Sequence, residues 1–202
     1  MKQLRKTLAL LTLLSLFVPS LGHAETPAQS VVHNFYTQLV ASMKQGEQLG
    51  YSGRYKKLEP AIRAAFNLPL MTRMAVGSSW AMASTDEQNE LVSAFSDFSV
   101  ASYASRFTAF DGEQFTVLSE KPTEGGVIVE TSLKPKDSEA VFLNYLMRAD
   151  DKGQYRIVDV FLNGTISELA TRRAEFSSIA RRDGIPALVN SLGQKSKQMG
   201  PS

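Results

Sequence analysis

The chain has 202 residues, with 22 basic and 20 acidic side chains, two histidines and no cysteine. Without cysteine, a disulfide framework, a thiol nucleophile and a thiolate metal site are excluded. Three of the basic residues and one histidine lie in the leader described next, so the remainder carries 19 basic and 20 acidic side chains, a formal charge of −1. This charge argues against a nucleic-acid-binding protein, and a single histidine, His33, excludes a two-histidine zinc site.

The N-terminus has the pattern of a secretory signal peptide. A short basic segment precedes an apolar run over residues 8–18, and small residues stand at the −3 and −1 positions before Glu25, namely Gly22 and Ala24. An apolar run of this length is short for a membrane span. We expect residues 1–24 to be cleaved between Ala24 and Glu25, an uncleaved anchor being the alternative. Residues 25–193 then form a single soluble extracytoplasmic domain, followed by a disordered tail over 194–202.

The first half of the remaining chain predicts helices. Apolar residues recur every three or four positions from residue 31 to 43, which indicates a helix from Pro27 to about residue 46 with Thr26 as its N-cap. Similar patterns predict helices over 53–66, over 68–76 with Asn67 as N-cap, and over 85–110. For the last of these we expect a capping box from Thr85 to Gln88.

The second half changes its apolar period from about 3.6 to 2, which predicts strands over 115–118, 127–133, 140–148 and 155–162. Short turns between them favour an antiparallel meander. The third strand is apolar on both faces, so we expect both of its faces to be covered. A capping box from Thr165 to Glu168 should begin a helix that ends at Gly184, and a short helix should follow through Leu192. The order predicts an α+β fold with a curved sheet of about four strands between helices.

Four segments of the chain, taken in order, resemble the MlaC family of periplasmic lipid carriers, also called toluene-tolerance or solvent-resistance proteins. They are residues 67–80 (Asn-Leu-Pro-Leu-Met-Thr-Arg-Met-Ala-Val-Gly-Ser-Ser-Trp), 95–107, 155–160 and 176–192. Residues 68–80 look closest to the hopanoid-biosynthesis-associated HpnM branch. The resemblance implies an NTF2-like outline that encloses an apolar pocket for acyl chains. It also implies transport of phospholipid or hopanoid between an inner-membrane ABC- or MCE-type complex and an outer-membrane complex, or a hopanoid/RND-type exporter, without a cofactor.

Two sets of residues are candidates for the site that such a carrier needs. The first should line the lipid pocket, although core packing explains the same apolar pattern: Tyr103, Phe107, Val127, Val129, Val141, Leu143, Tyr145 and Met147. The second should dock partner proteins or meet lipid phosphates, with a solvated helix face as the plainer interpretation: Arg172, Arg173, Arg181 and Arg182. For Trp80 and His33 we favour ordinary packing or surface positions.

Two other classes of function compete with the carrier. A curled sheet can host proton-transfer chemistry, and Asp159 with Tyr145 and Tyr103 could share a pocket, where burial would raise the pKa of the carboxyl group. A hydrogen bond that only supports the fold explains Asp159 equally well, and no nucleophile motif is present, so we expect no catalysis. The remaining alternative is a ligand-free adaptor of a membrane-lipid assembly.

Overall fold

The computed structural model describes residues 24–200, so the predicted signal peptide lies outside the described residues except for Ala24. The elements follow in the order α1 (Pro27–Met43), α2 (Gly46–Ala65), α3 (Leu68–Val76), the 3-10 helix η1 (Gly77–Met82), α4 (Thr85–Arg106), β1 (Gln114–Thr123), β2 (Gly126–Lys134), β3 (Val141–Ala149), β4 (Tyr155–Leu162), β5 (Ile166–Ser167), α5 (Glu168–Asp183) and α6 (Ile185–Gln198). The predicted α+β class is confirmed.

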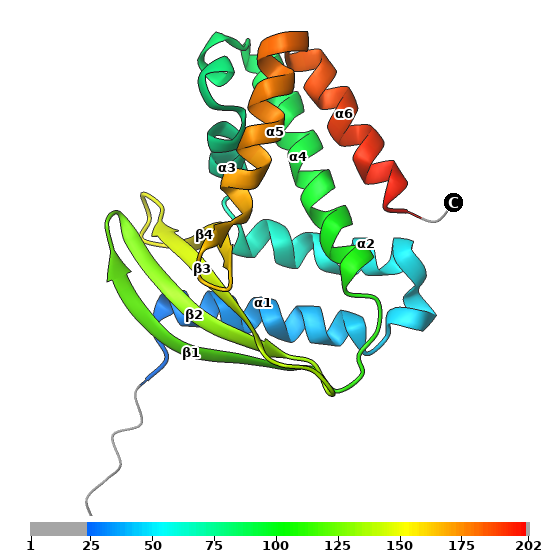
Figure 1. Cartoon of the computed structure of the whole chain (residues 1–202), viewed down its shortest axis with the longest axis vertical. Helices are drawn as coiled ribbons and strands as arrows, with labels where there is room; N and C mark the ends of the chain where they lie inside the picture. The colour runs from blue at the N-terminus through cyan, green and yellow to red at the C-terminus, as the bar shows by residue number, and fades with distance from the viewer. Residues whose placement is uncertain (1–23, 201–202) are drawn as a thin grey trace, which may run out of the picture.

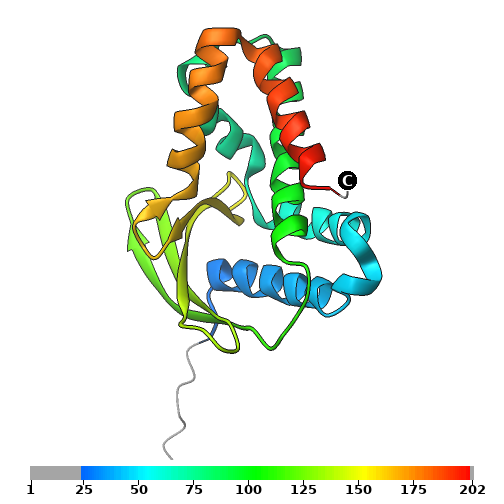
Figure 2. The same ribbon diagram turned by 45° about the vertical axis from the view of Figure 1, so that its right-hand side comes forward.

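The strands form an antiparallel sheet in the order β1-β2-β3-β4-β5, in which every strand pairs with its neighbour in sequence. The prediction of about four strands missed only the two-residue β5. The register shifts between Val117 and Ser119 and again between Leu146 and Met147. Bulges of this kind bend a strand and increase its twist. The sheet accordingly curves around one side of α1 (Figures 1 and 2).

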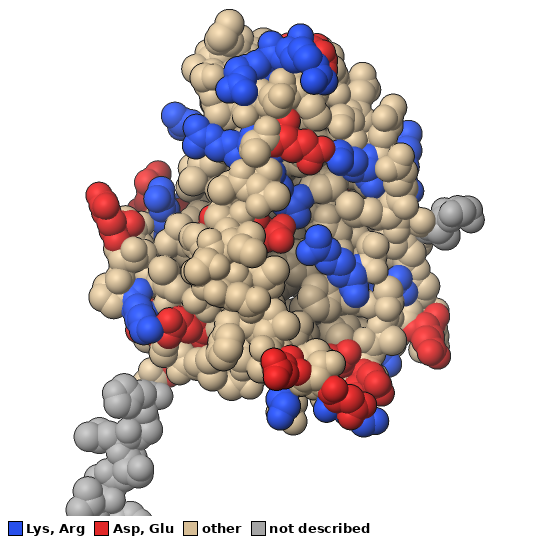
Figure 3. All heavy atoms as spheres, in the orientation of Figure 1, with Lys and Arg blue, Asp and Glu red and all other residues tan. Residues whose placement is uncertain are grey.

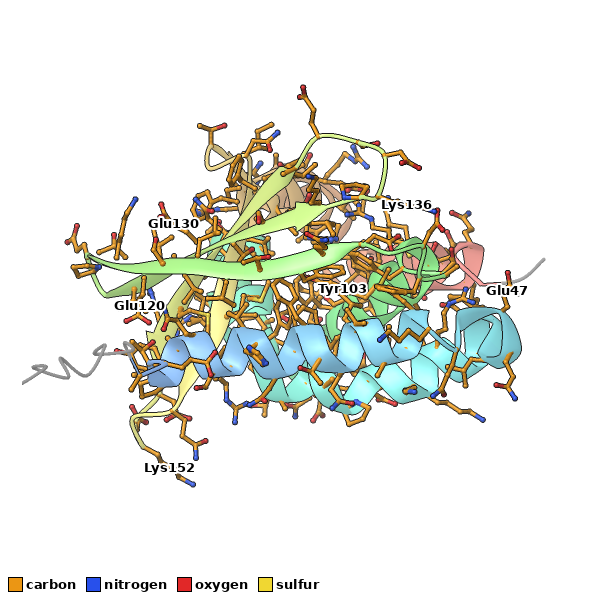
Figure 4. The ribbon with its side chains drawn as sticks, turned by 90° about the horizontal axis from the view of Figure 1, so that it is seen from below. Glu47, Tyr103, Glu120, Glu130, Lys136 and Lys152 are labelled. Carbon is orange, nitrogen blue, oxygen red and sulfur yellow. The ribbon has the colours of Figure 1, made fainter. Side chains whose placement is uncertain are left out.

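The molecule has two regions. In the sheet region, α1 and α2 lie beside the concave face of the sheet (Figures 1 and 4). In the helical region, α3, η1, α5 and α6 pack around the first part of α4, beyond one end of the sheet (Figure 1). Helix α4 belongs to both, because its last turns pass down to the sheet region (Figure 2).

Helix α1 shows why this sequence covers the sheet as it does. Thr26 caps the helix in a capping box with Gln29, and Pro27 occupies the first turn, where its missing N–H costs no hydrogen bond. The predicted apolar stripe is largely buried, including Val32, Phe35, Tyr36, Leu39 and Met43. Because these residues share one face, α1 presents a continuous apolar surface to the sheet.

Three helix boundaries differ from the predictions. Helix α2 begins at Gly46 rather than near residue 53, with a kink at Gly50, whose φ of 58° suits glycine. Helix α4 is capped by Ser84 and Glu87, one residue before the predicted box, and ends at Arg106. There the buried Arg54 donates to the carbonyl oxygen of Ala104 at 2.9 Å, which satisfies an acceptor at the end of the helix.

The N-cap of α5 is Ser167, whose hydroxyl accepts from the N–H of Ala170, and not Thr165. Residues 163–165 instead form the turn between β4 and β5, where Asn163 and Gly164 have positive φ. The prediction placed the cap too early because it did not include a further strand after this turn.

Two further expectations are wrong. The outer face of β3 is not fully covered, because Phe142 is 49% exposed there. The tail predicted to be disordered continues α6 as far as Gln198. Its ordering has a physical cause: Leu188 and Leu192 are buried in the helical region, and Lys195 forms an ion pair with Glu175 of α5 at 2.8 Å. Among residues 24–200, no helix is long and apolar enough to cross a membrane.

Candidate binding cavity

A cavity of about 160 Å³ lies between the concave face of the sheet, α1, α2 and the last turns of α4. Its sheet wall consists of Phe115, Leu143, Tyr145, Val160 and Leu162, and its helical wall includes Tyr36, Leu39, Phe66, Tyr103 and Phe107. Figure 3 shows a hollow near the centre of this face of the molecule, with basic side chains beside it. Most of the wall is therefore apolar or aromatic.

Helix α4 contributes one complete face to this cavity. Ser99, Ser102, Tyr103 and Arg106 all line it, and their spacing of three, four and seven residues places them on the same side of a helix. The two serine hydroxyls donate to the carbonyl oxygens of Phe95 and Phe98, each four residues earlier. These hydroxyls are thereby satisfied within the helix, so this part of the wall offers few free polar groups.

Aromatic rings hold the middle of the wall in place. Tyr103 lies between the sheet and α1 (Figure 4), where its ring stacks on Phe107 at 5.7 Å between centroids. It also meets Phe35 edge to face at 5.3 Å. The ring of Tyr36 lies 4.9 Å from Phe115 and 5.8 Å from Tyr145. Such contacts contribute beyond simple burial, so this wall is firmly packed behind the cavity surface.

A short polar chain connects α1 to the sheet. The hydroxyl of Thr131 donates to the carbonyl oxygen of Leu143, so its oxygen accepts from the hydroxyl of Tyr36, at 2.6 Å. Burial raises the pKa of Tyr36 to about 12. Burial likewise raises the pKa values of Tyr103 and Tyr145. The three phenols are therefore neutral at physiological pH and suit an apolar cavity.

Charge is confined to one end of the cavity. Arg106 at the end of α4 and Glu168 and Arg172 in the first turns of α5 line this end. The Arg172 side chain is only 19% exposed, its guanidinium carbon lies 4.7 Å from the ring centroid of Phe98, and its Nη2 is 3.6 Å from Oε2 of Glu168. Burial lowers the pKa of Arg172, and the Glu168 carboxylate partly opposes this shift. The cavity is thus amphipathic along its length.

The predicted lipid-contact set divides into two halves. Tyr103, Phe107, Leu143 and Tyr145 line the cavity. Val129 and Met147 lie instead in the packed core, and Val127 and Val141 lie outside the cavity wall. All four lie on the same face of the sheet as the cavity-lining residues, as strand alternation predicts. Alternation does not show how far along a strand a cavity extends, so it could not separate these four from the residues of the wall.

Sequence reasoning missed several members of the wall. Val160 and Leu162 lie on β4 with the alternation expected of an inward face, and Phe115 does the same on β1. Arg106 and Glu168 were also missed. The signal for Arg106 was its seven-residue separation from Ser99 on the long helix, whereas Glu168 carried no comparable signal.

The four arginines proposed for docking do not form one surface. Arg172 points into the cavity end, while Arg173, Arg181 and Arg182 are exposed on α5. Side chains of adjacent residues on a helix point about 100° apart, so Arg172 can face the cavity while Arg173 faces outward. Arg182 pairs with Asp183 at 2.7 Å. Arg173 lines a second, more open cleft with Arg73, Gly77 and Trp80.

The geometry gives no support to the catalytic alternative. Asp159 accepts from the N–H of Leu169 at 3.0 Å and from the hydroxyl of Ser167 at 2.6 Å, so it anchors the start of α5. It pairs with Leu146, whereas Tyr145 pairs with Val160, so Asp159 and Tyr145 lie on opposite faces of the sheet. His33 is exposed and its nearest charged partner is Glu25 at 3.5 Å. Within residues 24–200, no group of three or more His, Asp or Glu side chains is arranged to hold a metal ion.

A curved sheet, a helical cover and a cavity with one charged end define an α+β protein built around a binding pocket. A family model described as MlaC protein matches residues 33–194, and the chain belongs to this family. Its structure is similar to that of a phospholipid-binding protein from Ralstonia solanacearum determined in complex with a phospholipid, with a TM-score of 0.74 and 19% identity. The similarity covers 85% of this chain and 98% of that chain. No curated protein matches the sequence.

Proposed function

We propose that this protein is a lipid carrier whose cavity receives acyl chains of a phospholipid or a hopanoid-type lipid. The observation that carries the proposal is the distribution of polarity in the cavity. Aromatic and aliphatic side chains form most of its wall, and charged side chains gather at one end. An amphiphile with apolar chains and a polar headgroup has the same distribution. Membership of the MlaC family and the phospholipid bound to the Ralstonia protein support this choice of ligand.

The energetic need for such a carrier is large. Each methylene removed from water contributes about 0.8 kcal/mol, so a chain of ~16 carbons contributes on the order of 12 kcal/mol. A lipid leaving a membrane unaided must lose that stabilisation. A protein that encloses the chains lowers this barrier without forming or breaking a covalent bond, so we assign no enzymatic activity.

The size of the cavity adds a requirement. A volume of about 160 Å³ is smaller than the ~300–1,000 Å³ typical of small-molecule sites and is comparable with a ~150 Å³ cavity that accepts benzene. A complete acyl chain therefore needs a wider cavity. The cavity lies between the sheet and the last turns of α4, so outward movement of either element would widen it.

The route of transport follows the family. The signal peptide over residues 1–24 would direct the protein to the periplasm, where it would carry lipid between an inner-membrane ABC- or MCE-type complex and an outer-membrane complex, or a hopanoid/RND-type exporter. The exposed guanidinium groups of Arg173, Arg181 and Arg182 suit docking to acidic surfaces of such partners. They lie outside the cavity, so docking and lipid binding would use different side chains.

Two neighbouring residues of β3 provide the test. Leu143 lines the cavity, and Phe142 faces the opposite, exposed side. Secreted protein is purified and its lipid content measured by native mass spectrometry and solvent extraction. We expect lipid with the wild type and with Phe142→Arg, and none with Leu143→Arg at near-native circular dichroism. Lipid retained by folded Leu143→Arg would show that the chains bind elsewhere, and a lipid-free wild type would favour the ligand-free adaptor.

A further inference from the structure

The charged end of the cavity contains more positive than negative charge. Arg106 and Arg172 contribute two guanidinium groups, and Glu168 contributes the one carboxylate among the lining residues. Lys and Glu residues elsewhere on the surface do not line this end. One positive charge is therefore left uncompensated beside an apolar cavity, where charge interactions are stronger than in bulk water.

The two guanidinium groups also have unused hydrogen-bond donors. None of the side-chain hydrogen bonds within residues 24–200 uses Arg106 or Arg172, whereas the buried Arg54 donates to two carbonyl oxygens. The Arg172–Glu168 separation of 3.6 Å exceeds the usual 2.7–3.2 Å of a hydrogen bond, so this pair interacts only through charge. Arg172 is mostly buried nonetheless, held by the face of Phe98. Its unpaired nitrogens are nevertheless not fully buried, so an oxygen atom of a ligand that enters this end of the cavity can reach them.

We propose that Arg106 and Arg172 form a binding site for the phosphate of a lipid headgroup whose acyl chains occupy the cavity. This inference rests on the proposed lipid-carrier function and specifies its ligand as a phosphate-bearing lipid. A planar guanidinium group can donate two parallel hydrogen bonds to two oxygens of one phosphate. Two such groups, one on α4 and one on α5, would hold the phosphate at the end of the apolar wall. The chains then extend past Tyr103 toward Leu143.

Glu168 acts against the ligand in this arrangement. Its carboxylate neutralises part of the charge of Arg172 in the free protein and repels an approaching phosphate. It lies four residues before Arg172 on the same helix, so the phosphate replaces it as the partner of Arg172 without a change of backbone. Glu168→Gln should consequently strengthen binding of a phosphate-bearing lipid.

Two tail-matched probes separate the headgroup from the chains. The exported protein is purified, delipidated and titrated with two lipids. One is dioleoylphosphatidylglycerol, and the other is dioleoylglycerol, which has the same chains and no phosphate. We expect the wild type to bind the phosphatidylglycerol roughly tenfold more tightly, the value of one charge-assisted contact. Arg106→Gln, at an exposed position, and Arg172→Lys, which keeps charge and stem, should each reduce this preference. The double variant with glutamine at both positions should abolish it.

Arg181→Gln is the matched control, because this arginine lies on the same helix outside the cavity and should keep the full preference. Equal binding of both probes by the wild type would overturn the phosphate site while leaving the lipid carrier intact. Binding of neither probe would remove the carrier function itself. Inorganic phosphate that binds as tightly as the lipid, with no gain from the chains, would mark a free-anion site and also overturn the inference.

Discussion

The helical region and the sheet region bury their apolar side chains to different extents. In the helical region Leu91, Phe95, Phe176, Leu188 and Leu192 have at most 1% of their surface exposed. In the sheet region the inward-facing side chains of Leu143, Val160 and Leu162, which line the cavity, are only half-buried, although Val129, Tyr145 and Met147 on the same face are buried. Helices can interdigitate along their whole length, whereas the curved sheet packs on α1 but makes few contacts with α4, and the cavity lies between the sheet and the last turns of α4. The sheet region therefore packs tightly over part of its inward face and leaves a looser wall only where the cavity lies.

The most direct test of this contrast makes one substitution in both regions. Leu188→Ala should cost about 2–5 kcal/mol of unfolding free energy, because it leaves a void among fully packed helices. Leu143→Ala should cost only about 1 kcal/mol, since part of that side chain already borders open space. Urea unfolding of lipid-free protein measures both. Equal losses would show that the cavity wall is packed as tightly as the helical core.

A second test addresses the junction where β4 leads into α5. Asp159→Asn preserves the size of the side chain and replaces the carboxylate with an amide. The carboxylate accepts hydrogen bonds from the N–H of Leu169 and from the hydroxyl of Ser167. We expect a loss of about 1–3 kcal/mol, as for weakened hydrogen bonds at a buried site. Thermal unfolding checks this, and lipid content per folded molecule should be unchanged. Loss of lipid without loss of stability would assign Asp159 to the binding site instead.

The polar chain from α1 to the sheet predicts a smaller effect with a characteristic pH dependence. Tyr36→Phe should cost about 1 kcal/mol at neutral pH, because it removes the hydrogen bond to Thr131. Burial raises the pKa of Tyr36 from 10.0 to about 12 in the folded protein. The folded state thus favours the protonated phenol, and its contribution is complete below pH 10 and is lost as the pH rises toward 12.

The measurement is the free energy of unfolding between pH 8 and 12, for wild type and Tyr36→Phe. The free energy of unfolding of the wild type should fall across this range. That of the variant should fall less steeply because Tyr36 is gone, but it should still fall because burial also raises the pKa values of Tyr103 and Tyr145. Parallel curves would mean that the ionisation of Tyr36 has no influence on folding.

The smallest effect on stability is expected on the exposed surface of α5. Arg181→Glu combined with Arg173→Glu changes exposed side chains that have no carboxylate within ion-pair distance among residues 24–200, so stability should change by less than about 0.5 kcal/mol. Transfer of lipid to partner-containing membranes should slow, and more at low salt than at high salt. A variant that loses its lipid but transfers normally per loaded molecule would place these arginines at the headgroup.

The sequence predicts the elements well because local periodicity determines them. Thr26 and Asn67 are caps as predicted, and the stripe on α1 and the inward face of β3 are also correct. The errors at α4 and α5 arose where serine and threonine near the start of the helix offered competing caps, Ser84 beside Thr85 and Ser167 near Thr165. The position of the cavity along β3 could not be predicted, because it depends on where the end of α4 meets the sheet.

The hydrogen bond from Tyr36 to Thr131 joins residues 95 positions apart, whereas each strand of the sheet pairs with the next. Hairpins close short loops, so the meander can assemble quickly from local contacts, while docking of α1 must close a loop spanning half the chain. We therefore expect α1 and the sheet to open as separate cooperative units. Detachment of α1 exposes the concave face while the strands stay paired, so slow hydrogen exchange in β2 and β3 should coexist with faster exchange in α1.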